Sequence, residues 1–223
     1  MNRTIRTAFA ITATAICAAG CATPQPIAAS PDALPALQGQ TLTIVTYAQN
    51  ANFMQMTAGA AAFGALGAAA AVSRSAELVR EHNLVNPSVR VAEKLTPVLN
   101  EKLKPSSVNP VANPLDRAMN TAALATLAGN KGLVFDIAGG SQSVYFPVDW
   151  SHYRVMYAGL ARLVDASTGK VVAQSPCKFD SGEEMNPPTY DELYANNAAL
   201  LKAKMQTAAD ACVGQMTQAL FGN

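Results

Sequence analysis

Asp149, Ser151 and His152 lie together in the stretch DWSH. These are the residue types of a hydrolytic triad, in which a carboxylate orients an imidazole that activates a hydroxyl. A working triad is usually assembled from distant segments, because the side chains of adjacent residues seldom point at one another productively. We therefore interpret DWSH as a turn at the start of a strand, and we predict that the protein is not an enzyme.

Metal chemistry has little support. The chain has two histidines, His82 and His152, and neither has a partner ligand at the spacing of a zinc or iron site. Asp180, Glu183 and Glu184 form an acidic stretch, but they lack the spacing of an EF-hand loop. We expect a solvated acidic loop there, with calcium binding as the less favoured alternative. No metal or other cofactor is predicted.

Covalent chemistry is expected at the N-terminus. Arg3 and Arg6 precede an uncharged apolar segment, residues 8–19, as in an export signal. Small residues then lead into Cys21. This arrangement resembles the lipobox of bacterial lipoproteins, in which a signal peptidase cuts before a cysteine that receives a diacylglyceryl group. The resemblance implies a signal peptide over residues 1–20 and a lipid on Cys21.

The residue after this cysteine bears on the location. In the Gram-negative proteins that the lipobox resembles, aspartate after the cysteine retains the protein in the inner membrane, whereas Ala22 implies the outer membrane. The alternative is ordinary cleavage near Ala22, which would give a soluble secreted protein. Residues 21–40 contain four prolines and predict an extended tether. Residues 41–223 then suit one domain.

Two cysteines remain for the folded part. Of the four in the chain, Cys17 leaves with the signal and Cys21 carries the lipid. Cys177 and Cys212 form an even pair in an exported chain, which predicts a disulfide bond. A reactive thiol pair is the alternative, but the spacing is not C-x-x-C and no histidine flanks either residue.

Hydrophobic periodicity gives the elements that would position these groups. Strands are expected at residues 41–47, 133–137, 144–148, 153–164 and from 171 onwards, and helices at 75–82, 87–103, 116–129 and 190–220. Pro97 predicts a kink or break in its helix, residues 106–114 a loop, and residues 165–170 a hairpin turn. The fold class is therefore α/β (α+β), a single domain with a mainly antiparallel sheet of about four to five strands, packed by helices and ending in a long helix.

The aromatic residues cluster around the central strands. Tyr145, Phe146, Trp150, Tyr153 and Tyr157 are all expected in the core. The alternative is an aromatic-lined groove for a ligand.

An uncharged run, FMQMTAGAAAFGALGAAAAV, covers residues 53–72 and has the length of a membrane span. Alanine and glycine dominate it, whereas membrane insertion depends on large apolar side chains. We therefore favour a closely packed helix over a span, with a mobile loop as the third alternative. Ala60, Gly64, Gly67 and Ala68 would form its flat interaction surface, against the domain or a partner.

Two stretches, FPVDW (146–150) and YRVMYAGLARLVDASTGKVVAQSPC (153–177), resemble a family of uncharacterised proteobacterial lipoproteins. Most of the mature chain follows the same order of features, and no activity comes with the resemblance. The hairpin alone is also similar to hairpins in the amino-terminal α/β domain of the Tol-system translocation protein and in curli-secretion lipoproteins. Both resemblances imply an α/β periplasmic domain.

Composition and net charge exclude one class of partner. The formal charge is +1 and no basic patch is present, so nucleic acid is not expected as a partner. The sequence predicts a lipid-anchored binding or assembly module of the cell envelope, which contacts an envelope protein or a second copy of itself. A carrier or chaperone for a small apolar ligand or lipid is the alternative.

Overall fold

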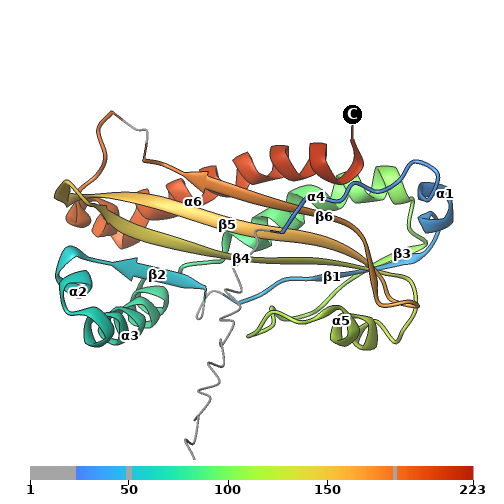
Figure 1. Ribbon diagram of the computed structural model, residues 1–223, viewed down its shortest axis with the longest axis horizontal. Helices are drawn as coiled ribbons and strands as arrows, with labels where there is room; N and C mark the ends of the chain where they lie inside the picture. Colours follow the sequence, from blue (N-terminus) through green and yellow to red (C-terminus); the bar gives the residue numbers. More distant parts are fainter. Residues whose placement is uncertain (1–23, 49–51, 183–184, 223) are drawn as a thin grey trace, which may run out of the picture.

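The computed structural model describes residues 24–48, 52–182 and 185–222. Figure 1 shows a long, twisted sheet with helices along it. The strands are β1 (Thr41–Val45), β2 (Phe53–Met56), β3 (Ser107–Pro110), β4 (Leu133–Phe146), β5 (Asp149–Asp165) and β6 (Lys170–Asp180). The helices are α1 (Leu34–Leu37), α2 (Ala58–Ala62), α3 (Gly64–His82), α4 (Pro87–Leu103), α5 (Thr121–Leu127) and α6 (Tyr190–Phe221).

The sheet has the order β3-β1-β4-β5-β6, and β2 pairs with the distal half of β4. The long β4–β5 and β5–β6 pairs are antiparallel, as expected. β1 and β2, by contrast, run parallel to β4, and β3 runs parallel to β1. The predicted single α/β domain is confirmed, but its sheet has six strands and is mixed.

β4 is longer than the sequence suggested. Residues 133–137 and 144–148 were predicted as two strands, yet β4 continues between them through Gly139 and Gly140. The ring of Tyr157 explains this, because a Cβ on Gly139 would lie 2.5 Å from the Tyr157 hydroxyl. Gly159 is paired with Gly139 on the neighbouring strand and has the same contact, at 2.8 Å. The two glycines therefore make room for a buried aromatic ring within the sheet.

Two further predictions are corrected: the loop over residues 106–114, and the break that was one of the two alternatives at Pro97. Residues 107–110 form β3 rather than a loop, because an edge strand needs few backbone donors and Pro110 ends it. Helix α4 runs unbroken through Pro97. The lost backbone hydrogen bond is offset by the burial of Leu95 and Leu99 against the sheet.

α4 and α6 cover one face of the sheet and contact each other. Leu95 and Leu99 of α4 and Met216 of α6 pack there on Phe135 and Leu163 of the sheet. α5 lies on the opposite face, where Leu124 and Ala125 contact Val45, Val134 and Val164. A second cluster at the other end joins α3, β2, β5 and the first half of α6.

The predicted C-terminal helix begins with a capping box, in which Thr189 and Glu192 each accept from the other's backbone N–H. It is then interrupted. Asn196, Asn197 and Ala198 have left-handed φ angles of 51°, 58° and 55°, so α6 consists of a short first segment and a long second one. The break lets Leu193 and Ala198 both reach the core cluster beside α3.

Residues 24–40, within the predicted tether, lie against the domain. The backbone of Ile27 exchanges two hydrogen bonds with Gln174 of β6, both at 2.8 Å. Gln174 Nε2 donates to the carbonyl of Gln25 (2.7 Å), and the N–H of Ala29 donates to Leu220 (2.8 Å). Prolines in this stretch therefore prevent regular strand structure without preventing attachment to the edge of the sheet.

Candidate interaction surface and neighbouring groups

The residues of DWSH do contact one another, unlike our expectation for adjacent side chains. Asp149 opens β5, and its Oδ1 accepts from the Ser151 hydroxyl at 2.6 Å. Its Oδ2 lies 2.5 Å from Nδ1 of His152. The Ser151 hydroxyl lies 3.2 Å from that same Nδ1. A triad instead uses the two imidazole nitrogens separately, one for the carboxylate and one for the hydroxyl. This geometry is a hydrogen-bonded turn at a strand start, without a relay through the ring.

A cleft of about 600 Å³ adjoins this turn. Asp149 and His152 line it together with Glu192, Leu200 and the segment 185–189. Hydrogen bonds from Ser151, with help from His152, lower the pKa of Asp149. The backbone N–H and hydroxyl of Thr189 lower the pKa of Glu192, and His152 adds a smaller effect. The cleft thus has an acidic wall, and its carboxylates are engaged in local turns and caps.

The other residues considered as metal ligands, His82 and Asp180, contact other side chains away from this cleft. His82 is buried, and its Nδ1 lies 3.4 Å from Oδ1 of Asn197. Asp180 accepts from Arg154 (3.0 Å) and from the N–H of Gly182 (2.9 Å). Glu183 and Glu184 lie outside the described residues. Among the residues that are described, no cluster of three or more histidine, cysteine or carboxylate side chains could hold a metal ion.

The aromatic residues divide into two groups. Tyr153 and Tyr157 are buried, as predicted, and Tyr145 and Phe146 are half-buried. Trp150 was also expected in the core, but it is 69% exposed and its indole N–H donates to the carbonyl of Pro147 (3.1 Å). Val148 beside it is almost fully exposed, so the β4–β5 turn presents apolar side chains to the outside.

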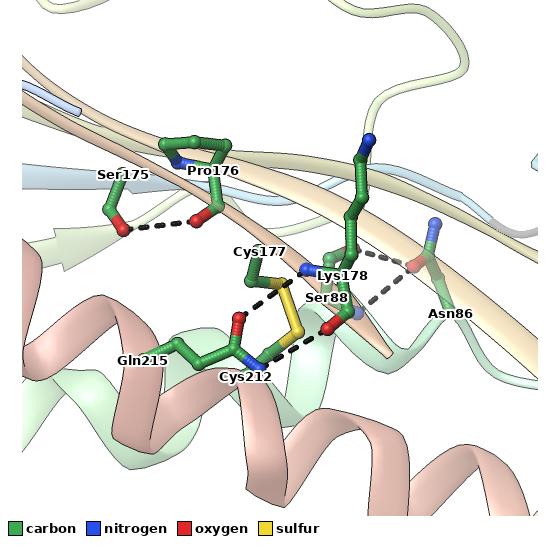
Figure 2. The surroundings of a disulfide bond; sticks show 8 residues. All are labelled: Asn86, Ser88, Ser175, Pro176, Cys177, Lys178, Cys212 and Gln215. Atoms are coloured by element: carbon green, nitrogen blue, oxygen red, sulfur yellow. Dashed lines mark hydrogen bonds between the residues drawn. A yellow bond between two sulfur atoms is a disulfide. The ribbon is translucent and has the colours of Figure 1, made fainter. Parts of the chain in front are cut away.

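Cys177 of β6 and Cys212 of α6 form the predicted disulfide, with Cα atoms 5.5 Å apart. Figure 2 shows that the bond lies between the strand and the helix, next to Gln215. The Gln215 side chain accepts from the N–H of Lys178 (3.4 Å) and donates to its carbonyl (3.2 Å). It thereby acts as a strand partner for the outer edge of β6, which blunts that edge against pairing with another chain.

The small-residue run does not form one helix. Residues 53–56 form strand β2, α2 follows, and Gly64 turns the chain into α3 with a φ of +55°. A Cβ on Gly67 would lie 1.8 Å from the carbonyl oxygen of Ala60. The predicted close approach of backbones is therefore present, but it occurs between α2 and α3 within the domain. The predicted surface of Ala60, Gly64, Gly67 and Ala68 is not a single face, because Gly67 is buried whereas Gly64 and Ala68 are exposed.

The exposed side of α2 and α3 carries other residues. Phe63 is 74% exposed, Leu66 82% and Val72 55%. Exposed alanines fill the space between them, and no charged residue occurs from Ala58 to Ser73. The inner side of α3 is fixed by Ala71, Ser75 and Leu78, which are buried. We refer to the outer side, from Ala61 to Ser73, as the apolar face; sequence periodicity alone did not separate it from the buried stripe.

The described helices include none that combines the length and the hydropathy needed to cross a bilayer. α3 is long enough, but its second half carries Arg74, Glu77, Arg80 and Glu81.

Comparisons with known proteins give little further guidance. No protein-family profile matches the chain, and no curated relative matches it. Among solved structures, a neuraminyllactose-binding hemagglutinin homolog from Helicobacter pylori is similar over 88% of each chain, at 9% identity and a TM-score of 0.40. A PelC dodecamer from Paraburkholderia phytofirmans is similar over 81% of this chain and 89% of the other, at 13% identity and a TM-score of 0.28. Likeness at this level supports no functional argument.

Proposed function

We propose that this protein is a lipoprotein of the bacterial outer membrane that acts as a non-catalytic binding and assembly module on the periplasmic side. The apolar face of α2 and α3 is the observation that carries the proposal. Phe63, Leu66 and Val72 are exposed on the α2–α3 unit, with no charge among the residues between them. An exposed apolar area of this kind on a folded domain is typical of a surface that binds another molecule.

The partner on this face is an envelope protein. Exposed alanines lie between the three larger side chains, and an uncharged surface of this composition fits an apolar helix or sheet face of a second protein. Burial of three large side chains provides roughly 5 kcal/mol before the cost of association.

Photo-crosslinking in intact cells tests the partner. A photoreactive residue at position 66 should give one defined adduct, whereas the same residue at Leu127, an exposed leucine on α5, should give none. Absence of an adduct at 66, together with migration of the protein as a monomer in native membranes, would remove the proposal.

The lipid anchor is tested separately. Cells labelled with radioactive palmitate should incorporate label into the native chain and lose it in the Cys21→Ser variant. Label that persists in this variant would refute the anchor at Cys21 but leave the apolar face as a binding surface.

The second candidate function is a carrier for a small apolar ligand. One observation favours it: a groove of about 400 Å³ between α4 and the β1–β3 edge. Ile44, Val89, Ala92 and Val108 line it, so its walls are largely aliphatic. Native mass spectrometry of protein purified from membranes should detect a bound lipid-sized mass if this function holds, and should show the unliganded chain if it does not.

A further inference from the structure

The chain is fixed to the domain only a few residues after Cys21. Gln25 accepts a hydrogen bond from Gln174 of β6, and Ile27 pairs with the same residue through its backbone. Three residues separate Cys21 from Gln25, and the four residue steps between them span at most about 14 Å in a fully extended chain. A free tether from 21 to 40 would instead span up to about 70 Å. A lipid on Cys21 therefore keeps this edge of the sheet close to the bilayer.

The apolar face lies at the other edge. β6 is separated from β2 by β5 and β4, and α3 lies beyond β2. Three strand spacings and the width of a helix add about 25 Å. Ile27 is also offset along the strands, because its partner Gln174 is in register with Arg162 and Asp136, whereas β2 begins opposite Ser141. This offset adds about 17 Å along β4, so Ile27 and α3 are roughly 30 Å apart.

The surface near Ile27 suits the interface of a bilayer. Ile27 is 43% exposed although it is apolar. Lys170 and Lys178 of β6 are exposed, and in Figure 2 the Lys178 side chain points away from α6. The carboxylate on this strand, Asp180, is paired with Arg154. An apolar side chain flanked by lysines is favourable beside anionic headgroups.

We propose that the bilayer lies against β6 and the segment 24–29, and that the apolar face of α2 and α3 points away from it. This orientation rests on the proposed anchor at Cys21. It leaves the apolar face open to a protein in the periplasm and out of reach of the lipid to which the chain is attached.

Tryptophan fluorescence in vesicles tests the orientation. Trp150 is the only tryptophan of the chain, so a Trp150→Phe background allows one reporter at a time. The reporters are Ile27→Trp and, as a matched exposed apolar position, Val72→Trp. A chain that starts at Cys21, with Cys177 and Cys212 joined, carries a maleimide lipid on its one free thiol. It is inserted into vesicles of phosphatidylethanolamine and phosphatidylglycerol that contain a nitroxide-labelled headgroup.

Quenching at position 27 should exceed quenching at position 72 at least about fivefold, because position 27 would lie at the interface and position 72 roughly 30 Å from it. Equal quenching at the two positions, or stronger quenching at 72, would overturn the orientation. A ten-residue Gly/Ser insertion after Ala22 should reduce quenching at 27, and unchanged quenching would show that the short attachment does not set the orientation. Because the lipid is added chemically, this test is independent of lipidation in cells, which the palmitate experiment decides.

Discussion

Asp136 of β4 illustrates how single residues hold this fold together. Its carboxylate is fully buried and accepts from Nε of Arg162 at 2.7 Å, from Nη2 of Arg162, and from the hydroxyl of Tyr47 at 2.5 Å. Arg162 Nη2 also donates to the carbonyl of Met119, and the N–H of Met119 donates to Tyr47. Burial raises the pKa of Tyr47, which keeps its hydroxyl a donor. The network thus ties the segment before α5 to the sheet.

Removal of the cation from this network should be costly. In Arg162→Met the Asp136 carboxylate remains buried without its charged partner, and we expect a loss of about 3–5 kcal/mol in the free energy of unfolding. Urea denaturation measures it. Tyr47→Phe, which removes the two hydrogen bonds of the hydroxyl but no charge, should lose about 2 kcal/mol. Equal losses in the two variants would contradict the assignment of Arg162 as the main partner.

The interruption of α6 depends on a few positions with positive φ. Asn196 is exposed and has a φ of 51°. Asparagine tolerates this conformation better than alanine does, so Asn196→Ala should destabilise the protein by about 1 kcal/mol, whereas Asn196→Gly should be neutral or stabilising. Thermal unfolding of the two variants distinguishes these effects. A stabilised Asn196→Ala variant would indicate that α6 is continuous in solution.

At the scale of elements, three connections hold α6 in place. The disulfide joins it to β6 across 35 residues, which stabilises the fold by about 4 kcal/mol in the chain-entropy model. Gln215 binds the edge of the same strand. Arg90 and Lys94 of α4 both contact Asp210 of α6, each at 2.7 Å. These connections keep α6 on the sheet although the helix is broken near its start.

The Asp210 cluster predicts a pH dependence. Hydrogen bonds from Arg90 and then Lys94 hold the pKa of Asp210 well below its usual range. A carboxylate with a lowered folded-state pKa stabilises the protein above its unfolded pKa of about 4, and this contribution is lost as the pH falls toward the folded value. We expect the free energy of unfolding to fall more steeply below about pH 4 in the native protein than in Asp210→Asn. Parallel pH profiles in the two proteins would contradict this, and high salt should reduce the difference because the pair is exposed.

At the scale of the whole molecule, the edge at β6 and the apolar face beside β2 lie on different parts of the sheet. The edge formed by β6 and residues 24–29 is where the chain emerges from its proposed anchor. Figure 1 shows α2 and α3 beside β2 at one end of the sheet, and α1 and α5 at the other. The apolar face is thus on a unit that packs on the domain through one side only. Its other side is exposed, as the proposed assembly function requires.

We expect a substitution on the apolar face to disrupt assembly without changing the stability of the folded domain. Leu66→Glu places a charge at its most exposed large side chain, and we expect the unfolding free energy to change by less than about 0.5 kcal/mol. Complexes extracted from membranes in mild detergent should shrink to the size of the monomer in this variant. Leu127→Glu on α5 serves as the control and should leave them intact. Complexes that survive in Leu66→Glu would exclude the apolar face as the contact surface.

The sequence by itself determined the local features: the first strand, the 165–170 turn with Gly169 at positive φ, the capping box at Thr189 and the pairing of Cys177 with Cys212. Each depends on neighbours along the chain, on periodicity or, for the cysteines, on the small number of possible partners. Tertiary structure alone decided that β4 passes through its glycines, that β2 and β3 add in parallel, and that Asp136 is buried with Arg162. These depend on contacts between residues far apart in the chain, such as Tyr157 over Gly139.

The run at residues 53–72 contains one feature that the sequence determined and one that only the tertiary structure decided. Its composition predicted close backbone approach, and only the fold determined that Gly67 meets Ala60 while Phe63, Leu66 and Val72 remain exposed.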